Sequence, residues 1–341
     1  MQYRRLGNTG LKVSELCFGA MTFGSNFLNI GAVEQDGADE LVSRAAEAGV
    51  NFFDTANVYS YGESEEILGR ALENAGVARE SAIIATKVQG PMSDAASNGE
   101  GDVNNKGLSR QNIMASCEAS LERLGTDYID LYQVHGWDPT TPMEETLRTL
   151  DDLVRMGKVN YIGVSNWTAR HVAKSLEISR AHDWEAFASL QAHYSLVGRD
   201  LEHELLPLAR EEGLGVLPWS PLSGGFLSGK YTRENENPEG ARRAEFDFPP
   251  VDERGFDAVD ALRGMADEKN ASVAQVALAW LLHQSGVASV ILGANKMSQL
   301  EDNLGAAEIR LSDDELSRLS ATTEPPTLYP QWMLDFQATK I

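Results

Sequence analysis

The chain alternates, eight times over, between a short apolar run and a longer segment with helical spacing. The apolar runs, rich in β-branched, aromatic and other large residues, cover residues 16–19, 51–54, 82–86, 129–133, 161–164, 187–191, 215–219 and 289–293. The helical segments cover residues 37–48, 64–72, 109–124, 141–156, 169–180, 202–212 and 258–283, and an eighth begins at Ser298. Repeated βα units build parallel sheets, and eight of them favour closure. The sequence therefore predicts an α/β fold, a (β/α)8 or TIM barrel, as one domain over residues 1–341.

Local signals mark the chain start and several helix starts. Residues 1–15 contain the turn tetrapeptide Gly7-Asn8-Thr9-Gly10 between the flanking segments 2–6 and 11–15, which predicts a β-hairpin capping the bottom of the barrel. Capping boxes, in which a Ser or Thr precedes an acidic residue by three positions, predict helix starts. They occur at Thr141, Ser298 and Ser312.

Three stretches do not fit the repeat. Residues 90–107 and 223–257 follow the third and seventh strands, so in a barrel they are expected to line a substrate pocket on the catalytic face. Residues 325–341 form a tail that is expected to pack on the surface or to reach a pocket mouth. It carries Tyr329, Trp332, Met333 and Phe336 among its large apolar residues.

Composition excludes several classes of function. The formal net charge of −22 over 341 residues repels nucleic acids and anionic membranes, so neither is an expected partner. No apolar run reaches the roughly 18 residues of a membrane span, and no apolar segment follows Arg4 and Arg5, which favours a cytoplasmic protein. Cys17 and Cys117 are predicted to be buried core thiols, and the spacing of the histidines predicts no metal site. Nothing in the pattern predicts an oligomeric state.

Four polar residues lie where strands of a barrel deliver catalytic side chains. Asp54 ends the second strand, Lys87 follows the third, His135 follows the fourth, and Tyr59 comes five residues after Asp54. Taken singly, an aspartate after a strand is usually a helix cap and a tyrosine usually packs. Because the carboxyl ends of barrel strands meet on one face, the four together predict a site.

The four residue types suit the reduction of a carbonyl group. A phenol of pKa about 10 is a poor acid at neutral pH, but a nearby ammonium such as Lys87 is expected to lower the pKa of Tyr59. Asp54 would hold Lys87 charged and oriented, and His135 would donate a hydrogen bond to the substrate carbonyl. Such a site lacks only a hydride donor.

The chain resembles the aldo-keto reductases. The resemblance spans nearly the whole sequence and is carried in combination by residues 18–24, 53–59, 85–87, 131–135 and 163–166. It implies that Asp54, Tyr59, Lys87 and His135 form a catalytic tetrad and that the chain is a nicotinamide-dependent oxidoreductase acting on a small carbonyl or alcohol. Phe23, Phe27, Trp137 and Trp332 suggest an apolar substrate pocket.

The resemblance also implies where the cofactor lies. Ser165, Asn166 and Gln191 would hold the nicotinamide carboxamide, and Trp219 would stack on the ring. Contacts from the first two strands would come from Gly19, Met21, Thr22 and Asp54. At the adenosine end the resemblance implies Gln299, Asp302 and Asn303, where Gln299 occupies a position that is arginine in many members.

The residues themselves indicate how the phosphates are bound. No Gly-x-Gly-x-x-Gly motif follows any strand, so binding is not of the Rossmann type. The small-residue loop after the seventh strand offers backbone donors for a pyrophosphate, with Ser220, Leu222 and Gly224 as candidate contacts. Gly293, Asn295 and Lys296 lead into the helix at Ser298, whose start favours a 2′-phosphate. The expected cofactor is therefore NADP(H).

Two other functions remain open from the sequence. A lysine at a barrel strand end can form a Schiff base, which would make Lys87 the nucleophile of an aldolase. The family that the chain resembles also includes β subunits of potassium channels, so a cofactor-holding regulatory module is the second alternative.

Overall fold

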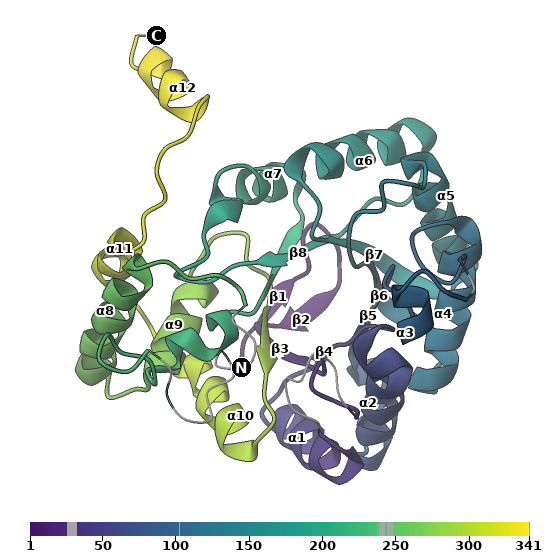
Figure 1. Cartoon of the computed structure of the whole chain (residues 1–341), viewed down its shortest axis with the longest axis horizontal. Coiled ribbons are helices and arrows are strands. Elements are labelled where there is room, and N and C mark those ends of the chain that lie inside the picture. Colours follow the sequence, from purple (N-terminus) through teal and green to yellow (C-terminus); the bar gives the residue numbers. More distant parts are fainter. Residues whose placement is uncertain (26–32, 102, 237, 239–242, 244–247, 341) are drawn as a thin grey trace.

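Eight parallel strands form the centre of the molecule, and helices surround them (Figure 1). The structure is a computed structural model that describes residues 1–25, 33–101, 103–236, 238, 243 and 248–340. The strands of the barrel are β3 (Leu16–Gly19), β4 (Phe52–Asp54), β5 (Ile83–Val88), β6 (Ile129–Val134), β7 (Val159–Ser165), β8 (Ser189–His193), β9 (Gly215–Trp219) and β10 (Val290–Gly293). They pair in sequence order, with β10 beside β3. A parallel bridge between Val216 and Val287 joins the remaining edges, so the predicted (β/α)8 barrel is confirmed.

Helices surround the strands, except the last one, which stands away from the barrel (Figure 1). In chain order they are α1 (Gln35–Glu47), α2 (Glu63–Asn74), α3 (Asp94–Ser97), α4 (Arg110–Leu124), α5 (Met143–Arg155), α6 (Ala169–His182), α7 (Leu205–Glu212), α8 (Arg254–Lys269), α9 (Val273–Leu282), α10 (Met297–Leu304), α11 (Asp313–Ala321) and α12 (Gln331–Ala338). In α5, Met143, Leu147 and Leu150 recur at helical spacing and are buried, so the apolar stripe faces the sheet. No helix in the described ranges is both long and apolar enough to span a membrane.

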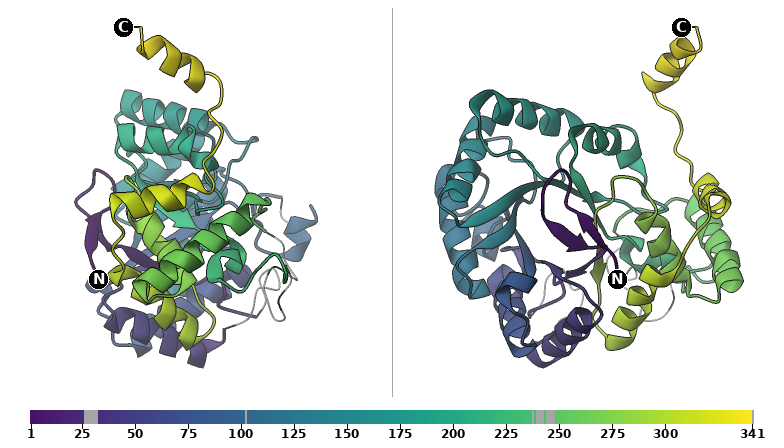
Figure 2. Two further views of the ribbon diagram at one scale, coloured as in Figure 1. Left: turned by 90° about the vertical axis from the view of Figure 1, so that its left-hand side faces the viewer. Right: turned by 180° about the vertical axis from the view of Figure 1, so that it is seen from behind.

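The amino-terminal hairpin closes one end of the barrel (Figure 2). Strands β1 (Tyr3–Arg5) and β2 (Lys12–Ser14) pair antiparallel. Leu6 and Val13 are fully buried against residues inside the barrel, which include Cys17, Phe52, Leu131 and Leu217. The backbone N–H of Asn8 donates to the carbonyl of Gly213 at 2.8 Å and ties the turn to the loop before β9. The predicted hairpin cap is confirmed, and Cys17 and Cys117 are buried as expected.

The helix predicted over residues 258–283 is wrong as a single element. The chain forms α8 and α9 there, separated by Asn270 in the left-handed conformation (φ 50°). Ser272 then starts α9 through a capping box in which its hydroxyl accepts from the backbone of Gln275 and the Gln275 side chain accepts in return. A left-handed asparagine ends a helix, and a serine cap two residues later begins the next.

Of the three predicted capping boxes, only the one at Ser312 forms, with Glu315 as its partner. The Thr141 hydroxyl donates to Asp138 at 2.7 Å instead, and α5 begins at Met143 after Pro142. Ser298 lies inside the first turn of α10, which starts at Met297 behind Lys296, and no side chain caps that helix.

The carboxyl-terminal tail stands away from the barrel (Figures 1 and 2). No residue of α12 is buried, and Tyr329 is 74% exposed. Both expectations for this segment, packing on the surface and reaching the pocket mouth, are therefore wrong. The segment before α12 contains Pro325 and Pro326, whose fixed φ favours an extended chain that leads away from α11.

Candidate active site

Three neighbouring strands deliver the polar residues singled out from the sequence to one end of the barrel. Asp54 is the last residue of β4, Lys87 is the penultimate residue of β5, and His135 directly follows β6. Tyr59 opens the 3-10 turn Tyr59–Gly62 that leads from β4 into α2. Since the strands are parallel and in register, their carboxyl ends bring these residues together.

Lys87 is the centre of the cluster. Its Nζ donates to Asp54 Oδ2 at 2.5 Å, to the Thr55 carbonyl at 2.7 Å and to Tyr59 Oη at 3.4 Å. Lys87 is fully buried and Asp54 is 3% exposed. Burial by itself lowers the pKa of Lys87, but Asp54 and Tyr59 outweigh burial and raise it. The three donor positions of the ammonium are all used, so the lysine is charged and fixed in place.

The pKa of the Tyr59 phenol is affected more by burial than by the Lys87 ammonium beside it. Burial raises the pKa of Tyr59, and the opposing effect of Lys87 is smaller. The lowered pKa expected from the sequence is therefore wrong in its net direction. Tyr59 keeps its proton at neutral pH, and Lys87 is placed to stabilise the phenolate once that proton has left.

His135 is held neutral beside this pair. Its ring meets the Tyr59 ring edge to face, with the centroids 5.6 Å apart. Burial, and then the charge of Lys87, lower the pKa of His135 to about 3. A neutral imidazole can donate a hydrogen bond from one N–H, but it holds no extra proton to transfer.

The lowered pKa values of two neutral histidines, His135 and His193, allow a prediction of how the free energy of unfolding depends on pH. The pKa of His135 is lowered to about 3 and that of His193 to about 4, chiefly by burial. Below their unfolded pKa of about 6.5 the unfolded chain binds protons that the folded chain does not, so stability is lost as pH falls from about 6.5 toward 4. We expect urea titrations to show that the free energy of unfolding falls by on the order of a few kcal/mol across that pH window. The double variant His135→Gln/His193→Gln should lose less, and an equal loss would contradict the assignment.

Two glutamines hold the other oxygen of Asp54. Gln191 Nε2 donates to Asp54 Oδ1 at 3.0 Å, and Gln133 Nε2 donates to the same oxygen at 3.2 Å. Gln191 Nε2 also lies 3.3 Å from Gln133 Oε1. The family resemblance implied a role for Gln191, but the sequence analysis missed Gln133, although its position two residues before His135 places both on the same side of the strand.

The residues proposed for the nicotinamide carboxamide also lie at this end of the barrel. Asn166 has a positive φ of 57°, and its Nδ2 donates to the His135 carbonyl at 3.0 Å and to Ser165 Oγ at 2.9 Å. Trp219 Nε1 donates to Asn166 Oδ1 at 3.1 Å. The Trp219 ring neighbours the rings of His193 and Phe248, with centroid separations of 4.9 Å and 6.0 Å. Hydrogen bonds thus join Ser165, Asn166 and Trp219 across β7 and β9.

The loop after β9 provides a compact, glycine-rich turn. Ser220 and Gly224 have positive φ, and the Gly224 N–H donates to Ser220 Oγ at 3.1 Å. A Cβ on Gly224 would come within 2.7 Å of the Phe248 carbonyl, so only glycine fits. Leu222 is half-buried at the start of this turn.

The start of α10 carries unused positive and hydrogen-bonding groups. Lys296 is exposed and forms no ion pair with any residue that the structure describes. The backbone N–H groups of Met297 and Ser298 likewise have no acceptor among the described residues. Gly293 faces open space, and the Asn295 N–H donates to Gln299 Oε1 at 3.1 Å. These donors fit a phosphate group.

Other predicted contacts lie near the same face, with some differences. Gly19 pairs with Asp54 and with Gly293 across the neighbouring strands. Met21 is half-buried just beyond β3, and Thr22 Oγ1 donates to the Ala294 carbonyl at 3.4 Å. Two of the residues proposed for the adenosine end contact the protein itself. Asp302 accepts a hydrogen bond from the Ser272 hydroxyl at 2.9 Å, and Asn303 is only 6% exposed. Phe27, suggested as a pocket residue, lies outside the described residues.

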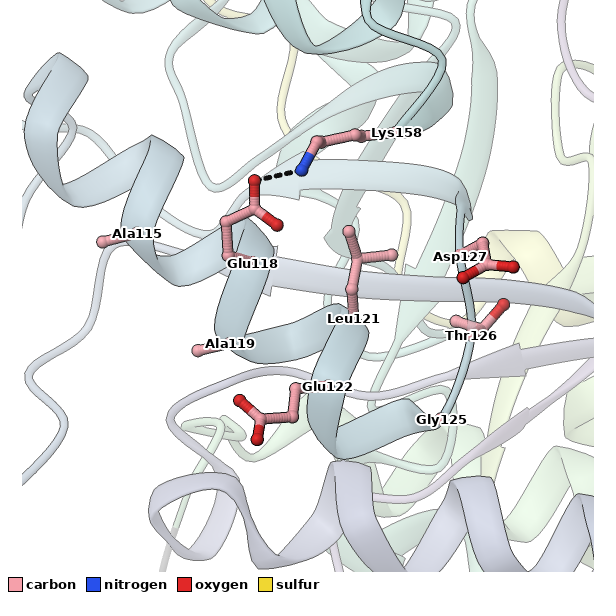
Figure 3. A pocket seen from close by; sticks show the side chains of 9 residues that line it. All are labelled: Ala115, Glu118, Ala119, Leu121, Glu122, Gly125, Thr126, Asp127 and Lys158. Atoms are coloured by element: carbon pink, nitrogen blue, oxygen red, sulfur yellow. Dashed lines mark hydrogen bonds and ion pairs between the residues drawn. The ribbon is translucent and has the colours of Figure 1, made fainter.

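A groove of about 770 Å³ lies elsewhere on the surface, along α4 and the loop that follows it (Figure 3). Gly125, Thr126 and Asp127 line it just before β6, and Lys158 lines it just before β7. It is therefore at the amino ends of the strands, opposite the Asp54 cluster. Within the groove Lys158 forms an ion pair with Glu118.

Known proteins are similar to this sequence over nearly its full length. A family model described as "Aldo/keto reductase family" matches residues 15–324. An uncharacterized oxidoreductase, YrpG, of Bacillus subtilis (strain 168) is 38% identical over 94% of this chain and 94% of its own length. Versiconal hemiacetal acetate reductase of Aspergillus parasiticus is 34% identical over 97% of this chain and 99% of its own length. A probable voltage-gated potassium channel subunit beta of Oryza sativa subsp. japonica is 36% identical over 91% of this chain and 92% of its own length.

Proposed function

The chain belongs to the aldo/keto reductase family, and from this premise we propose that it is an NADP(H)-dependent oxidoreductase that reduces an aldehyde or ketone to the alcohol, or catalyses the reverse. One observation carries the proposal most directly. The buried Lys87 ammonium contacts both the Asp54 carboxylate and the Tyr59 hydroxyl at the carboxyl ends of the strands. This arrangement combines a protonated phenol with a fixed positive charge that stabilises its conjugate base.

Each member of the cluster has a distinct role in reduction. The nicotinamide, when bound, supplies a hydride to the carbonyl carbon. Tyr59 transfers its proton to the carbonyl oxygen, and Lys87 stabilises the phenolate left behind. Asp54 keeps Lys87 charged and oriented. His135, neutral because its pKa is lowered to about 3, donates a hydrogen bond to the carbonyl oxygen and orients it.

The proposed cofactor contacts follow the rim formed by β3, β4, β7, β8, β9 and β10. Ser165, Asn166 and Gln191 would hold the carboxamide, and the Trp219 ring would stack on the nicotinamide. The pyrophosphate would lie against the turn after β9, and the 2′-phosphate against the start of α10. The full proposed set adds Gly19, Met21, Thr22, Asp54, Ser220, Leu222, Gly224, Gly293, Asn295, Lys296, Gln299, Asp302 and Asn303.

The proposal is tested by following reduced-cofactor absorbance while aldehydes, ketones and quinones are offered one at a time. We expect NADPH to be oxidised with at least one carbonyl class, and NADH to serve less well. Binding of NADPH without oxidation by any member of a broad panel would contradict the enzymatic role.

A relative named as a potassium channel β subunit supports a second candidate function, that of a regulatory module which holds the cofactor. The same screen separates the two candidates. Tight NADPH binding without turnover would favour the module, whereas turnover would favour the enzyme.

The aldolase alternative is opposed by the state of Lys87. A Schiff base requires a neutral amine with a free lone pair, and such lysines have lowered pKa values. Here Asp54 and Tyr59 outweigh burial and raise the pKa of Lys87, and the ammonium donates to three oxygens. Borohydride treatment with a carbonyl substrate should therefore leave no adduct on Lys87.

Replacing Lys296 with alanine tests the proposed 2′-phosphate site. NADPH should bind wild type more tightly than NADH, because Lys296 and the free N–H groups of α10 can form charge-assisted hydrogen bonds with the phosphate. The loss of one such bond should weaken NADPH binding by on the order of tenfold and leave NADH nearly unchanged. Titrations by quenching of tryptophan fluorescence measure both constants.

Lys12→Ala provides the control, since Lys12 is an exposed lysine on β2 at the opposite end of the barrel. This variant should bind both cofactors like wild type. Equal affinity of wild type for NADPH and NADH, or a parallel loss of both in Lys296→Ala, would show that the phosphate is bound elsewhere.

A further inference from the structure

Gln133 is a fully buried polar residue in the middle of the barrel. It lies on β6 between Lys87 of β5 and Gly163 of β7, with which it is in register. Gly163 leaves room for it, because a Cβ there would come within 3.0 Å of Gln133 Cγ. Leu131, two residues earlier, packs inside the barrel, so the alternation of the strand directs Gln133 inward as well.

The hydrogen-bonding chemistry determines how the two glutamines are turned. A carboxylate only accepts hydrogen bonds, so both Gln133 and Gln191 must present their Nε2 groups to Asp54 Oδ1. With Gln133 Nε2 directed at Asp54, its Oε1 is turned to accept from Gln191 Nε2 at 3.3 Å. Two acceptors therefore hold the Gln191 Nε2 group. The Gln191 carbonyl oxygen remains as the atom that can accept from a ligand amide.

We infer that Gln133 is a positioning residue that fixes both the Asp54 carboxylate and the Gln191 amide, and so couples the cofactor's carboxamide site to the catalytic ion pair. The inference rests on the function proposed above. Asp54 Oδ2 accepts from Lys87, and Asp54 Oδ1 accepts from the two amides. With donors on both oxygens the carboxylate cannot rotate freely, so Lys87 and, through it, Tyr59 keep their geometry.

The test compares two substitutions at Gln133 that keep its length. Gln133→Met removes the amide, and we expect kcat to fall by on the order of tenfold and NADPH to bind several-fold more weakly. Gln133→Glu keeps an acceptor oxygen for Gln191 but places a second oxygen against Asp54. Its activity should be low at neutral pH and recover on acidification, because a protonated glutamic acid again donates to Asp54. The other titratable groups beside Asp54 are Lys87, Tyr59 and Cys17, which wild type shares.

Gln284→Met is the matched control. Gln284 lies just beyond α9, and its Nε2 donates to the Trp280 carbonyl at 3.0 Å, so its loss should leave kcat and NADPH affinity unchanged. A purely structural role of Gln133 would lower the melting temperature and the activity of Gln133→Glu alike at every pH. That result, or a Gln133→Met variant with wild-type kcat and NADPH affinity, would overturn the inference. Should wild type oxidise NADPH with no carbonyl, the proposed function fails, and NADPH affinity of the two variants still decides the role of Gln133.

Discussion

Tyr59→Phe is expected to lower the rate of carbonyl reduction by roughly 10²–10⁴-fold, the loss typical when a general acid is removed. The substitution deletes one hydroxyl and keeps the ring that packs against His135. His135 cannot replace the lost acid, because its pKa is lowered to about 3 and the ring is neutral at pH 7. Steady-state NADPH oxidation with the best carbonyl substrate measures the loss, and NADPH affinity should be retained.

Tyr61→Phe provides a matched control two residues away. The Tyr61 hydroxyl is on the surface, where it donates to Asp94 at 2.6 Å, and the side chain is 45% exposed. Its removal should leave the reduction rate close to that of wild type. A Tyr59→Phe enzyme that retains most of its activity would show that the proton comes from another group.

The barrel could be predicted from the sequence because its signal is local and repeated. Each strand is a short apolar run bounded by turn residues, and the predicted and observed bounds of β3 and β9 are identical. Asp54 and His135 could be found in the same way, since a polar residue at the end of an apolar strand breaks the pattern. Lys87 was placed just after its strand, but β5 continues to Val88.

Other features depend on contacts that a sequence does not display. Gln133 lies within a strand, and its partners Asp54 and Gln191 are 79 and 58 residues away in the chain. The net direction of the Tyr59 pKa depends on how completely the ring is buried, which only packing determines. The tail, residues 325–341, was expected to contact the barrel because several of its residues are apolar. Burial also needs a surface within reach, and no residue of α12 is buried.

Lys87→Met is expected to change both the reaction rate and the stability of the fold. It removes a positive charge that lowers the pKa of Tyr59 and that pairs with the buried Asp54 carboxylate. Lys87 lowers the pKa of Tyr59 against the larger effect of burial, so its loss should raise the pKa of Tyr59 further and weaken the acid. We expect the rate to fall by at least about 10²-fold. The alkaline limb of the pH–rate profile should also move to higher pH. An unchanged profile would contradict the coupling of Tyr59 to Lys87.

The same substitution leaves the Asp54 carboxylate buried without its counter-ion, and losing one partner of a buried pair costs about 3–5 kcal/mol of folding free energy. The double variant Asp54→Asn/Lys87→Met separates this effect from the chemistry, because it removes both charges. Urea unfolding should show the double variant to be more stable than Lys87→Met alone, while its reduction rate stays as low. A double variant that regained activity along with stability would mean that Lys87 supports the fold and not the proton transfer. Continued inactivity in a stable protein is the result expected if the ammonium stabilises the phenolate of Tyr59.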